Sequence, residues 1–456
     1  MSGAGTIDSA LLGDLFGTAA MRAVFADEAR IAAMLRFEAG LAKAEAAEGV
    51  IPAAAAGPIG RACKALKPDL AGLGRATALA GNPAIPLVKA LIAAVKGDAA
   101  RYVHFGATSQ DAIDTGLMLQ IRDGLDLLLS DLAPAADAAA KLATEHRHTP
   151  TVGRTFLQHA VPIPFGLKAA NWLGLAARAH ARLRALRDTG LFVQLGGAAG
   201  SLSALGAKAV AVTDALAREL DLAAPDAPWH TARDRVAEIA AGVAITAGAM
   251  AKIARDVALL MQTDTAEAFE PAAPGKGGSS TMPQKRNPVG ATLAIAAAAQ
   301  AEARLAIIVG GMAQEQERGL GGWHAEWGAL AELFVLTAGA VAQVRAILTG
   351  LTVDAARMRA NLDASRGLVF AEAMSLALTP KVGRPEAHRK IETASRRVIA
   401  EGRPLQDLLA EDAAVVKALG TAGLKRIFDP TAQFGGADAF ITRALGAWDK
   451  ERATKT

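Results

Sequence analysis

The sequence predicts an all-α protein in which a bundle of long helices is flanked by two smaller helical domains. The chain of 456 residues exceeds the roughly 250–300 residues at which one hydrophobic core stops growing, so several domains are expected. It is rich in alanine, contains 13 Phe, 5 Trp and 1 Tyr, and lacks the alternating Val, Ile and Thr pattern of strands. Small side chains let long helices pack closely, which favours helices over a sheet.

Five long stretches show helical periodicity. The clearest is Trp229–Thr263, in which apolar residues recur at spacings typical of one helix face: Val236, Ile239, Val243, Met250, Ile253, Val257 and Leu260. The other four stretches are Asp111–His146, Pro162–Arg187, Pro288–Gly310 and Trp323–Leu348. All five are far longer than the average helix of about 11–12 residues. Helices of this length lying side by side indicate a bundle.

The predicted helices at the two ends of the chain are shorter than those in the middle. In the first hundred residues short helical segments are broken by five prolines, at positions 52, 58, 68, 83 and 86. After Leu351 shorter segments return, interrupted by Gly367, Pro380, Gly383 and Pro404. We therefore predict an N-terminal domain (1–110), a central bundle (111–350) and a C-terminal domain (351–456).

Composition argues against several classes of protein. The net charge is +4, with 49 basic and 45 acidic residues interspersed, which is unlike a nucleic-acid surface but compatible with a small anionic substrate. The single cysteine, Cys63, and the lack of Cys/His clusters predict neither a disulfide nor a metal site, as expected in the cytoplasm. Met1–Gly17 lacks the basic region of a secretory signal. The longest uncharged apolar run, near Ile239–Ala251, is shorter than the roughly 18 residues of a membrane span.

A Gly/Ser-rich loop, Gly275–Pro288, runs directly into a predicted helix. Asn287 suits the N-cap of that helix and Pro288 its first position. Glycines let a backbone approach a ligand, helix N-termini favour anions, and Lys285 and Arg286 add positive charge. The composition therefore suits carboxylate binding, although it is equally typical of a flexible basic loop.

The order of residues in this loop is more specific. Gly278-Ser-Ser-Thr-Met-Pro-Gln-Lys-Arg-Asn-Pro288 resembles the GSSxMPxKxNP signature of the fumarase/aspartase superfamily. Two further stretches resemble other active-site regions of that superfamily: His104-Phe-Gly-Ala-Thr-Ser-Gln-Asp111 and Gly153-Arg-Thr-Phe-Leu-Gln-His-Ala-Val-Pro162. The resemblance extends over essentially the whole chain. It implies a three-domain helical fold with a long central bundle, and a homotetramer whose active sites are each shared by three subunits.

The resemblance also implies roles for individual residues. Ser279 corresponds to the catalytic serine that exchanges a proton with a substrate carbon, and Lys285 and Asn287 correspond to residues that bind substrate carboxylate. On chemical grounds Lys285 is an alternative proton donor if burial makes its ammonium group a stronger acid. His104 matches a histidine of adenylosuccinate lyases, although it could simply pack beside its aromatic neighbours. The remaining substrate-binding candidates from the motifs are Thr108, Ser109, Gln158 and His159. For Thr108 and Ser109 the alternative is that they cap the following helix.

Phe156 departs from the superfamily pattern. Members that expel an amine or hydroxide carry a histidine directly after the threonine, where this chain has Thr155-Phe156. An amine or hydroxide needs a proton in order to leave, whereas a carboxylate, with a pKa near about 4, does not. Lactone formation, whose reverse expels a carboxylate, can dispense with that acid. The sequence therefore favours a cycloisomerase, and the resemblance implies 3-carboxy-cis,cis-muconate as substrate, 4-carboxymuconolactone as product, and no cofactor or metal.

The stretch from Gln314 to Trp327 resembles the corresponding part of such cycloisomerases. Arg318 is the candidate for a second carboxylate clamp. We expect the aromatic residues that follow it to serve packing: Trp323, His324 and Trp327. The Gly196–Ser201 loop is a weak match, and the 229–235 segment either supplies further cations or caps and solvates the start of the long helix.

Two alternatives remain open. One is an ordinary lyase of the superfamily, such as an adenylosuccinate lyase, in which His159 or His104 replaces the missing acid. The other is a catalytically silent structural protein of the crystallin kind, against which the intact Ser279, Lys285 and Asn287 argue.

Overall fold

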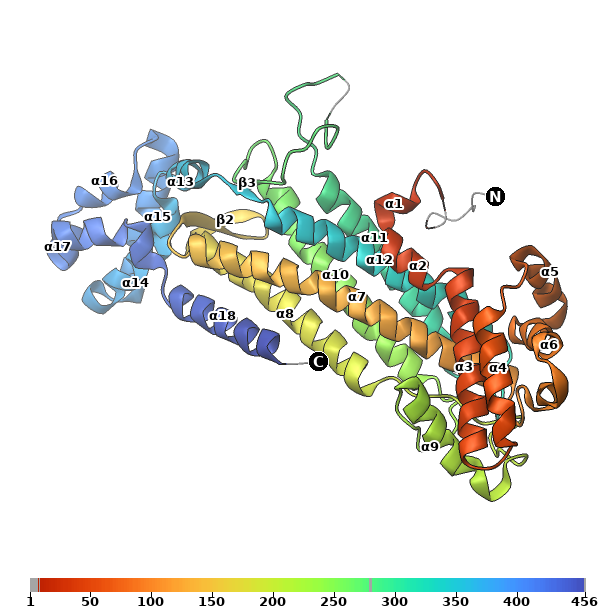
Figure 1. The fold of residues 1–456 in the computed structure, drawn as a ribbon. Helices are drawn as coiled ribbons and strands as arrows, with labels where there is room; N and C mark the ends of the chain where they lie inside the picture. The colour runs from red at the N-terminus through yellow and green to blue at the C-terminus, as the bar shows by residue number, and fades with distance from the viewer. Residues whose placement is uncertain (1–6, 8, 279–280, 455–456) are drawn as a thin grey trace.

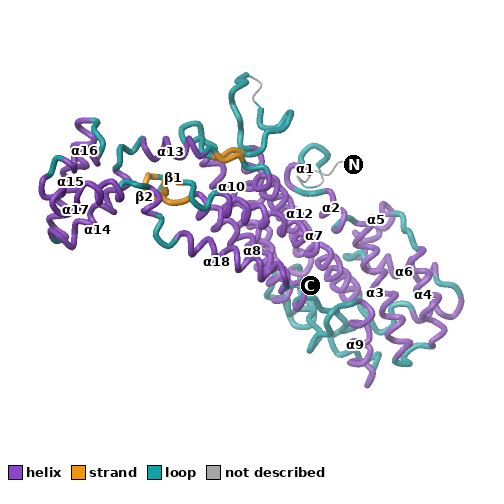
Figure 2. Tube along the Cα trace, turned by 60° about the vertical axis from the view of Figure 1, so that its left-hand side comes forward, coloured by secondary structure: helices purple, strands orange, loops and turns teal. Residues whose placement is uncertain are grey.

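The structure, a computed structural model, describes residues 7, 9–278 and 281–454. Nearly all of its regular elements are helices, so the predicted all-α class is confirmed (Figure 1). Long helices run along the molecule and shorter ones gather at its two ends (Figure 2). Buried apolar side chains form one large cluster along the long helices, a second in the N-terminal region and a third at the C-terminal end.

Five long helices form the central bundle: α7 (Ser109–Glu145), α8 (Phe165–Thr189), α10 (Asp234–Leu260), α11 (Val289–Gly310) and α12 (Gly322–Thr349). They pack mainly through alanine, leucine and valine, with α7 against α8 and α11 against α12. Each corresponds to a predicted helix, but α8 begins at Phe165 rather than Pro162, and α10 begins at Asp234 rather than Trp229.

The N-terminal region consists of short helices packed around α3. They are α1 (Gly13–Phe16), α2 (Ala19–Val24), α3 (Asp27–Ala47), α4 (Ala53–Ala65), α5 (Leu70–Ala80), α6 (Ala84–Ala94) and the 3₁₀ turn η1 (Gly97–Tyr102). The turn η2 (Gly206–Lys208) and α9 (Ala209–Leu220) come much later in the sequence, yet α9 packs on α3 and shares its core.

The C-terminal region is a second group of short helices. They are α13 (Ala355–Asp363), η3 (Leu368–Phe370), α14 (Ala371–Val382), α15 (Arg384–Glu401), α16 (Leu405–Ala410), α17 (Ala413–Ile427), η4 (Pro430–Gln433) and α18 (Ala437–Ala453). The last helix returns along α8, where Trp448 is buried in the central core and its indole N–H donates to Asp137 at 2.9 Å. The domain boundaries at residues 110 and 350 stay a prediction.

Two small antiparallel pairs of strands interrupt the helices. Strands β1 (Pro150–Thr155) and β2 (Gln158–Pro164) form a hairpin, and β3 (Ala268–Phe269) pairs with β4 (Thr352–Val353). The sequence did not predict these strands. The hairpin pairs Thr155 with Gln158, so its turn consists of Phe156 and Leu157, both with positive φ (48° and 62°). Positive φ at both central residues is typical of the type I′ turn, which normally favours Asn and Gly.

Three bundle helices, α10, α11 and α12, are long and apolar enough to cross a membrane, judged by length and composition alone. The expectation that no segment reaches this length was wrong, because it considered only runs without any charge. In the folded chain α10 and α12 are mostly buried against their neighbours. In α11, 28% of the most apolar window is buried, so much of an apolar helix faces outward.

Candidate active site

The carboxylate of Asp111 organises the end of the bundle where α7 begins. One of its oxygens accepts from the Gly196 N–H at 3.0 Å and lies 2.7 Å from Nε2 of His230. The other accepts from the N–H groups of Thr108 and Gly197, at 2.9 and 3.0 Å. Thr108 and Asp111 thereby form a capping box at the start of α7. The 104–111 motif and the Gly196 loop are thus joined by one buried acid.

Arg318 reaches the same place from the segment before α12. Its guanidinium donates to the side-chain oxygen of Gln110 at 2.8 Å and to the Ala198 carbonyl at 3.0 Å. Gln110 in turn donates to the His230 carbonyl at 2.8 Å. Within the described chain Arg318 forms no ion pair with a carboxylate, so its charge is available to an anion. Four predicted site residues gather at this end: His104, Thr108, Ser109 and Arg318.

His104 is held by an acid that the sequence analysis did not identify. Its Nδ1 lies 2.6 Å from Oε1 of Glu38, a buried residue of α3. Burial acts to lower the pKa of His104, but the charge and hydrogen bond of Glu38, with the charge of Asp111, outweigh it, so the pKa is raised. The imidazolium form is therefore favoured. An acid on the apolar face of α3, directly after Phe37, was the available signal for Glu38.

The segment around Arg233 is structural. Arg233 is buried, paired with Asp114 at 2.8 Å and with Glu326 at 2.6 Å, and stands at the N-cap position of α10, so it is at the helix start and is not a further cation for a ligand. The indole of Trp323 is buried and donates to Asp114 at 2.9 Å. The expected packing role of Trp323 is confirmed.

The signature loop projects from the bundle between β3 and α11 (Figure 1). Ser279 lies outside the described residues. Lys285 is exposed, and Asn287 is partly buried. The prediction that Asn287 caps the helix was wrong: Pro288 is the N-cap residue, and the carboxylate of Glu270 instead accepts from the first turn of α11. This acid comes from before the loop, so only the fold could bring it there.

The hairpin carries the third motif. Gln158 and His159 are exposed on β2, and Phe156 at the tip is 99% exposed. Partial burial, followed by the nearby charge of Arg154, lowers the pKa of His159, which favours the neutral ring.

The three motifs do not meet within one chain. Helix α7, with 37 residues, separates the 104–111 motif from the hairpin by about 55 Å at 1.5 Å per residue. Helix α11, with 22 residues, runs about 33 Å from the signature loop toward Arg318. The figures agree, with the loop and β2 far from α3 (Figure 1). Each end of the bundle therefore offers part of a site.

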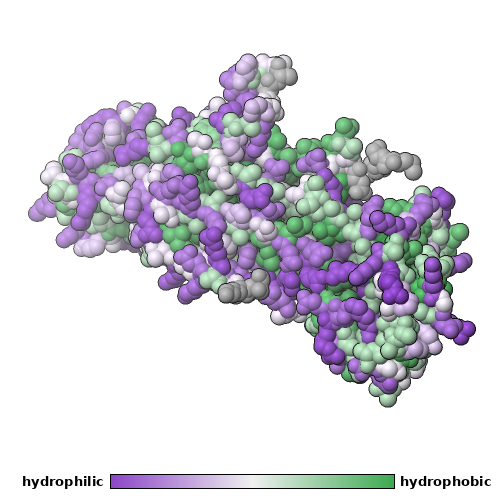
Figure 3. Space-filling model, viewed as in Figure 1, coloured by the Kyte–Doolittle hydropathy of each residue, from purple (hydrophilic) through white to green (hydrophobic). Residues whose placement is uncertain are grey.

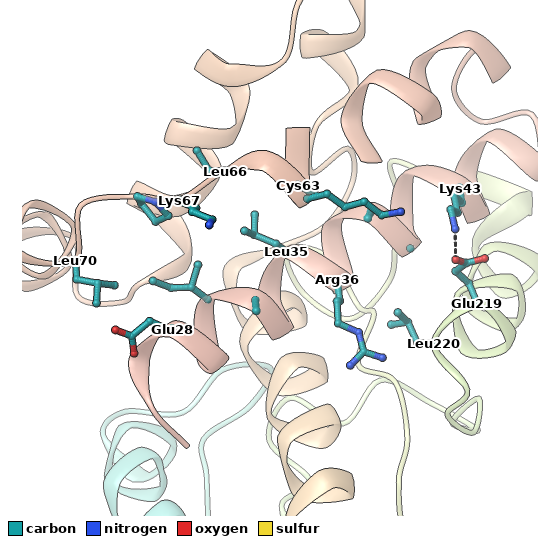
Figure 4. A pocket seen from close by; sticks show the side chains of 16 residues that line it. Glu28, Leu35, Arg36, Lys43, Cys63, Leu66, Lys67, Leu70, Glu219 and Leu220 are labelled. Carbon is teal, nitrogen blue, oxygen red and sulfur yellow. Dashed lines mark hydrogen bonds and ion pairs between the residues drawn. The ribbon is translucent and has the colours of Figure 1, made fainter. Parts of the chain in front are cut away.

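A pocket of about 780 Å³ lies away from all three motifs, between α3, α4, α5 and α9. Leu35, Cys63 and Leu220 are in its wall and Arg36 is among its cations (Figure 4). A smaller pocket of about 320 Å³ lies beneath the signature loop and is lined by Glu270, Lys276, Lys285, Arg286 and Asn287, among others. The motif residues and their charges, rather than pocket size, mark the candidate site. In the described part of the chain no group of three or more His, Cys, Asp or Glu residues could hold a metal ion.

Comparison with known proteins places the chain in a family. Residues 17–302 match the family described as lyase, and residues 367–444 match the adenylosuccinate lyase C-terminus. The chain is 52% identical to 3-carboxy-cis,cis-muconate cycloisomerase of Bradyrhizobium diazoefficiens, over 97% of this chain and 99% of the relative. It is 51% identical to the enzyme of the same name from Pseudomonas aeruginosa, over 94% of both chains.

A solved structure is similar over the same length. The crystal structure of 3-carboxy-cis,cis-muconate lactonizing enzyme from Pseudomonas putida superposes with a TM-score of 0.91 at 47% identity, covering 97% of this chain and all of that one. The fold, the order of the motifs and these matches agree. The chain therefore belongs to the lyase family of the fumarase/aspartase superfamily.

Proposed function

We propose that this protein is an enzyme that closes 3-carboxy-cis,cis-muconate to 4-carboxymuconolactone. The observation that carries the proposal is Phe156, which stands at the turn of the hairpin where related lyases hold a histidine acid. The full-length identity of about half to enzymes named for this reaction supports it. Its place of action would be the cytoplasm.

The reaction needs charge stabilisation and one proton. One substrate carboxylate attacks the conjugated double bond and forms the C–O bond of the lactone, while a proton adds to the carbon next to another carboxylate. Arg318 and Lys285, helped by the Asn287 amide, neutralise the tricarboxylate and the negative charge that develops as the ring closes. The fully protonated substrate and product are isomers, and at neutral pH the trianion takes up one proton from solvent, by way of the donor, as the lactone dianion forms; no other co-reactant is consumed.

Ser279 is proposed as the proton donor to carbon, with Lys285 as the alternative. Ser279→Ala should abolish turnover while substrate binding, measured by calorimetry, persists. If Ser279→Ala retains near-normal turnover and Lys285→Met loses it, the donor is Lys285. Lys285→Arg serves as the matched control, because it keeps the positive charge but is a far weaker acid.

A homotetramer with shared sites is proposed from the separation of the motifs. A complete site requires that the Arg318 end of one chain meet the loop and hairpin of others. The outward apolar residues of the bundle suit such packing: Ile245, Leu259, Ile307 and Val309. Green apolar patches interrupt the polar surface over the bundle (Figure 3).

Subunit complementation tests the shared site. The His104→Gln and Ser279→Ala chains should each be inactive, and an assembly of both should regain part of the activity. In such an assembly some sites combine the native Ser279 of a His104→Gln chain with the native His104 of a Ser279→Ala chain. A mixture of two variants from the same end, His104→Gln with Arg318→Met, is the control and should stay inactive. A monomer by light scattering would refute the assembly.

The function itself is tested by ultraviolet absorbance. Purified protein should remove the conjugated-diene band of 3-carboxy-cis,cis-muconate and leave adenylosuccinate intact. Phe156→His should lower or leave unchanged the cycloisomerase rate. Cleavage of adenylosuccinate, with a gain from Phe156→His, would instead identify a C–N lyase.

A further inference from the structure

Two acids on the buried side of α3 lie outside every motif. Glu38 and Glu45 are seven residues apart, which places them two helical turns apart on one face. Both are buried. Within the described part of the chain, Oε2 of Glu38 and both carboxyl oxygens of Glu45 have no hydrogen-bond partner. Burying a carboxylate whose oxygen has no hydrogen-bond partner costs free energy. The placement of Glu38 next to His104 therefore needs a reason other than stability.

His104 is held in an unfavourable backbone conformation. Its φ is 59°, in the left-handed region that residues other than glycine rarely adopt. Gly106, two residues later, has φ 68° and packs closely against Leu205. The loop therefore aims the imidazole into the protein toward Glu38, with Nδ1 used by that contact. Among the residues that the structure describes, Nε2 has no hydrogen-bond partner, so it is the ring nitrogen left for a ligand.

Two carboxylates, from two helices, act on the imidazole of His104. They are Glu38 on α3 and Asp111 on α7, whereas Glu45 on α3 and Cys63 on α4 lie near Glu38. Burial, with the neighbouring Glu38, raises the pKa of Glu45 to about 8 and that of Cys63 to about 12, so both are neutral near pH 7. Asp111 is already engaged by His230 and backbone N–H groups. Glu38 is thus the carboxylate that pairs directly with His104.

Resting on the proposed function, we infer that Glu38 is the positioning residue of His104: it fixes Nδ1–H as a donor and keeps the ring cationic, with Nε2–H presented to a substrate carboxylate. The arrangement is a carboxylate–histidine pair in which the acid orients the ring and supplies the compensating charge. Glu38 itself does not touch the substrate. Together with Arg318, the imidazolium gives this end of the site two cations for a tricarboxylate.

Glu38→Gln is the decisive variant, because it retains an acceptor oxygen and removes the charge. The ring signals of histidine-labelled protein, assigned by comparison with His104→Gln, should show a clearly lower pKa of His104 than in the wild type. With 3-carboxy-cis,cis-muconate, kcat/KM should fall about tenfold or more at pH 7.5, and the loss should shrink as the pH is lowered, because a larger share of the rings is then protonated without the help of Glu38.

Two variants control the result. Glu45→Gln replaces an acid that is already neutral near pH 7 and should leave the His104 titration and the activity at pH 7 unchanged. Glu38→Asp keeps the charge and should keep His104 protonated, and it remains informative if Glu38→Gln folds poorly. An unchanged His104 titration in Glu38→Gln, or loss of protonation in Glu38→Asp, would overturn the inference. The titration is independent of turnover, so inactivity of the wild type toward the muconate would refute the proposed function alone.

Discussion

Arg154 and Glu267 are joined by two parallel hydrogen bonds, from Nη2 to Oε1 at 2.7 Å and from Nη1 to Oε2 at 3.0 Å. Glu267 is fully buried and also accepts from Thr151 at 3.1 Å and Asn361 at 2.8 Å. Glu267, which follows the end of α10, thus links the hairpin to α13 through hydrogen bonds. The pair fixes where Phe156 is presented.

Removing one partner of this pair should be strongly destabilising, because it leaves the other charge buried. Arg154→Met should lower the free energy of unfolding by about 3–5 kcal/mol, and Arg154→Lys by less, since lysine keeps the charge but loses the two-pronged geometry. Urea unfolding measures both. If Arg154→Met and the wild type had the same free energy of unfolding, the Arg154–Glu267 pair would not stabilise the fold.

Glu270 should determine how firmly the signature loop is attached. Its carboxylate accepts from the N–H groups of Gly290 and Ala291, at 3.0 and 2.7 Å, where the N-cap residue Pro288 provides no side-chain hydrogen bond. Glu270→Ala should cost about 1 kcal/mol and accelerate hydrogen exchange in the first turn of α11. Glu270→Gln retains one acceptor and should exchange more slowly than Glu270→Ala. Unaltered exchange in both variants would contradict the capping role.

The hairpin turn contains strain that glycine should relieve. Leu157 adopts φ 62° with a largely exposed side chain, so Leu157→Gly removes a steric penalty without emptying the core. We expect stabilisation of about 1 kcal/mol. Leu157→Val, branched at Cβ, should instead destabilise the protein. Thermal unfolding of the matched pair checks the sign, and a lower melting temperature for Leu157→Gly would show that the side chain has a packing role.

Glu45 should make stability depend on pH. Its pKa is raised from 4.5 to about 8, so the folded state holds a proton that the unfolded state releases. The contribution of Glu45 to the free energy of unfolding is therefore fully present below about pH 4.5 and is lost as the pH rises through about 8. Glu45→Gln should stabilise the protein by at most about 5 kcal/mol at pH 9 and have little effect at pH 5. Melting temperatures across this range, with the partly exposed Glu48→Gln as control, test it. A constant difference at all pH values would contradict the assignment.

The sequence alone was sufficient for the helical class, the five bundle helices and the three motifs, because apolar periodicity and motif order are local properties. The predicted helix starts were less accurate. Residues 162–164, predicted to begin a helix, belong to strand β2, and residues 229–233, also predicted to be helical, precede α10. The hairpin was missed because its turn holds Phe and Leu instead of the residues that usually signal one.

The tertiary structure decided which charges meet. Glu38 with His104, Glu267 with Arg154 and Glu270 with the start of α11 each join residues whose pairing depends on how helices lie against one another. Local pattern carries no information about such pairs, since burial and charge compensation are set only when distant segments pack. The motifs also lie at opposite ends of the long helices. Because each residue adds a fixed rise along a helix, motifs at the two ends of a long helix are kept far apart within one chain.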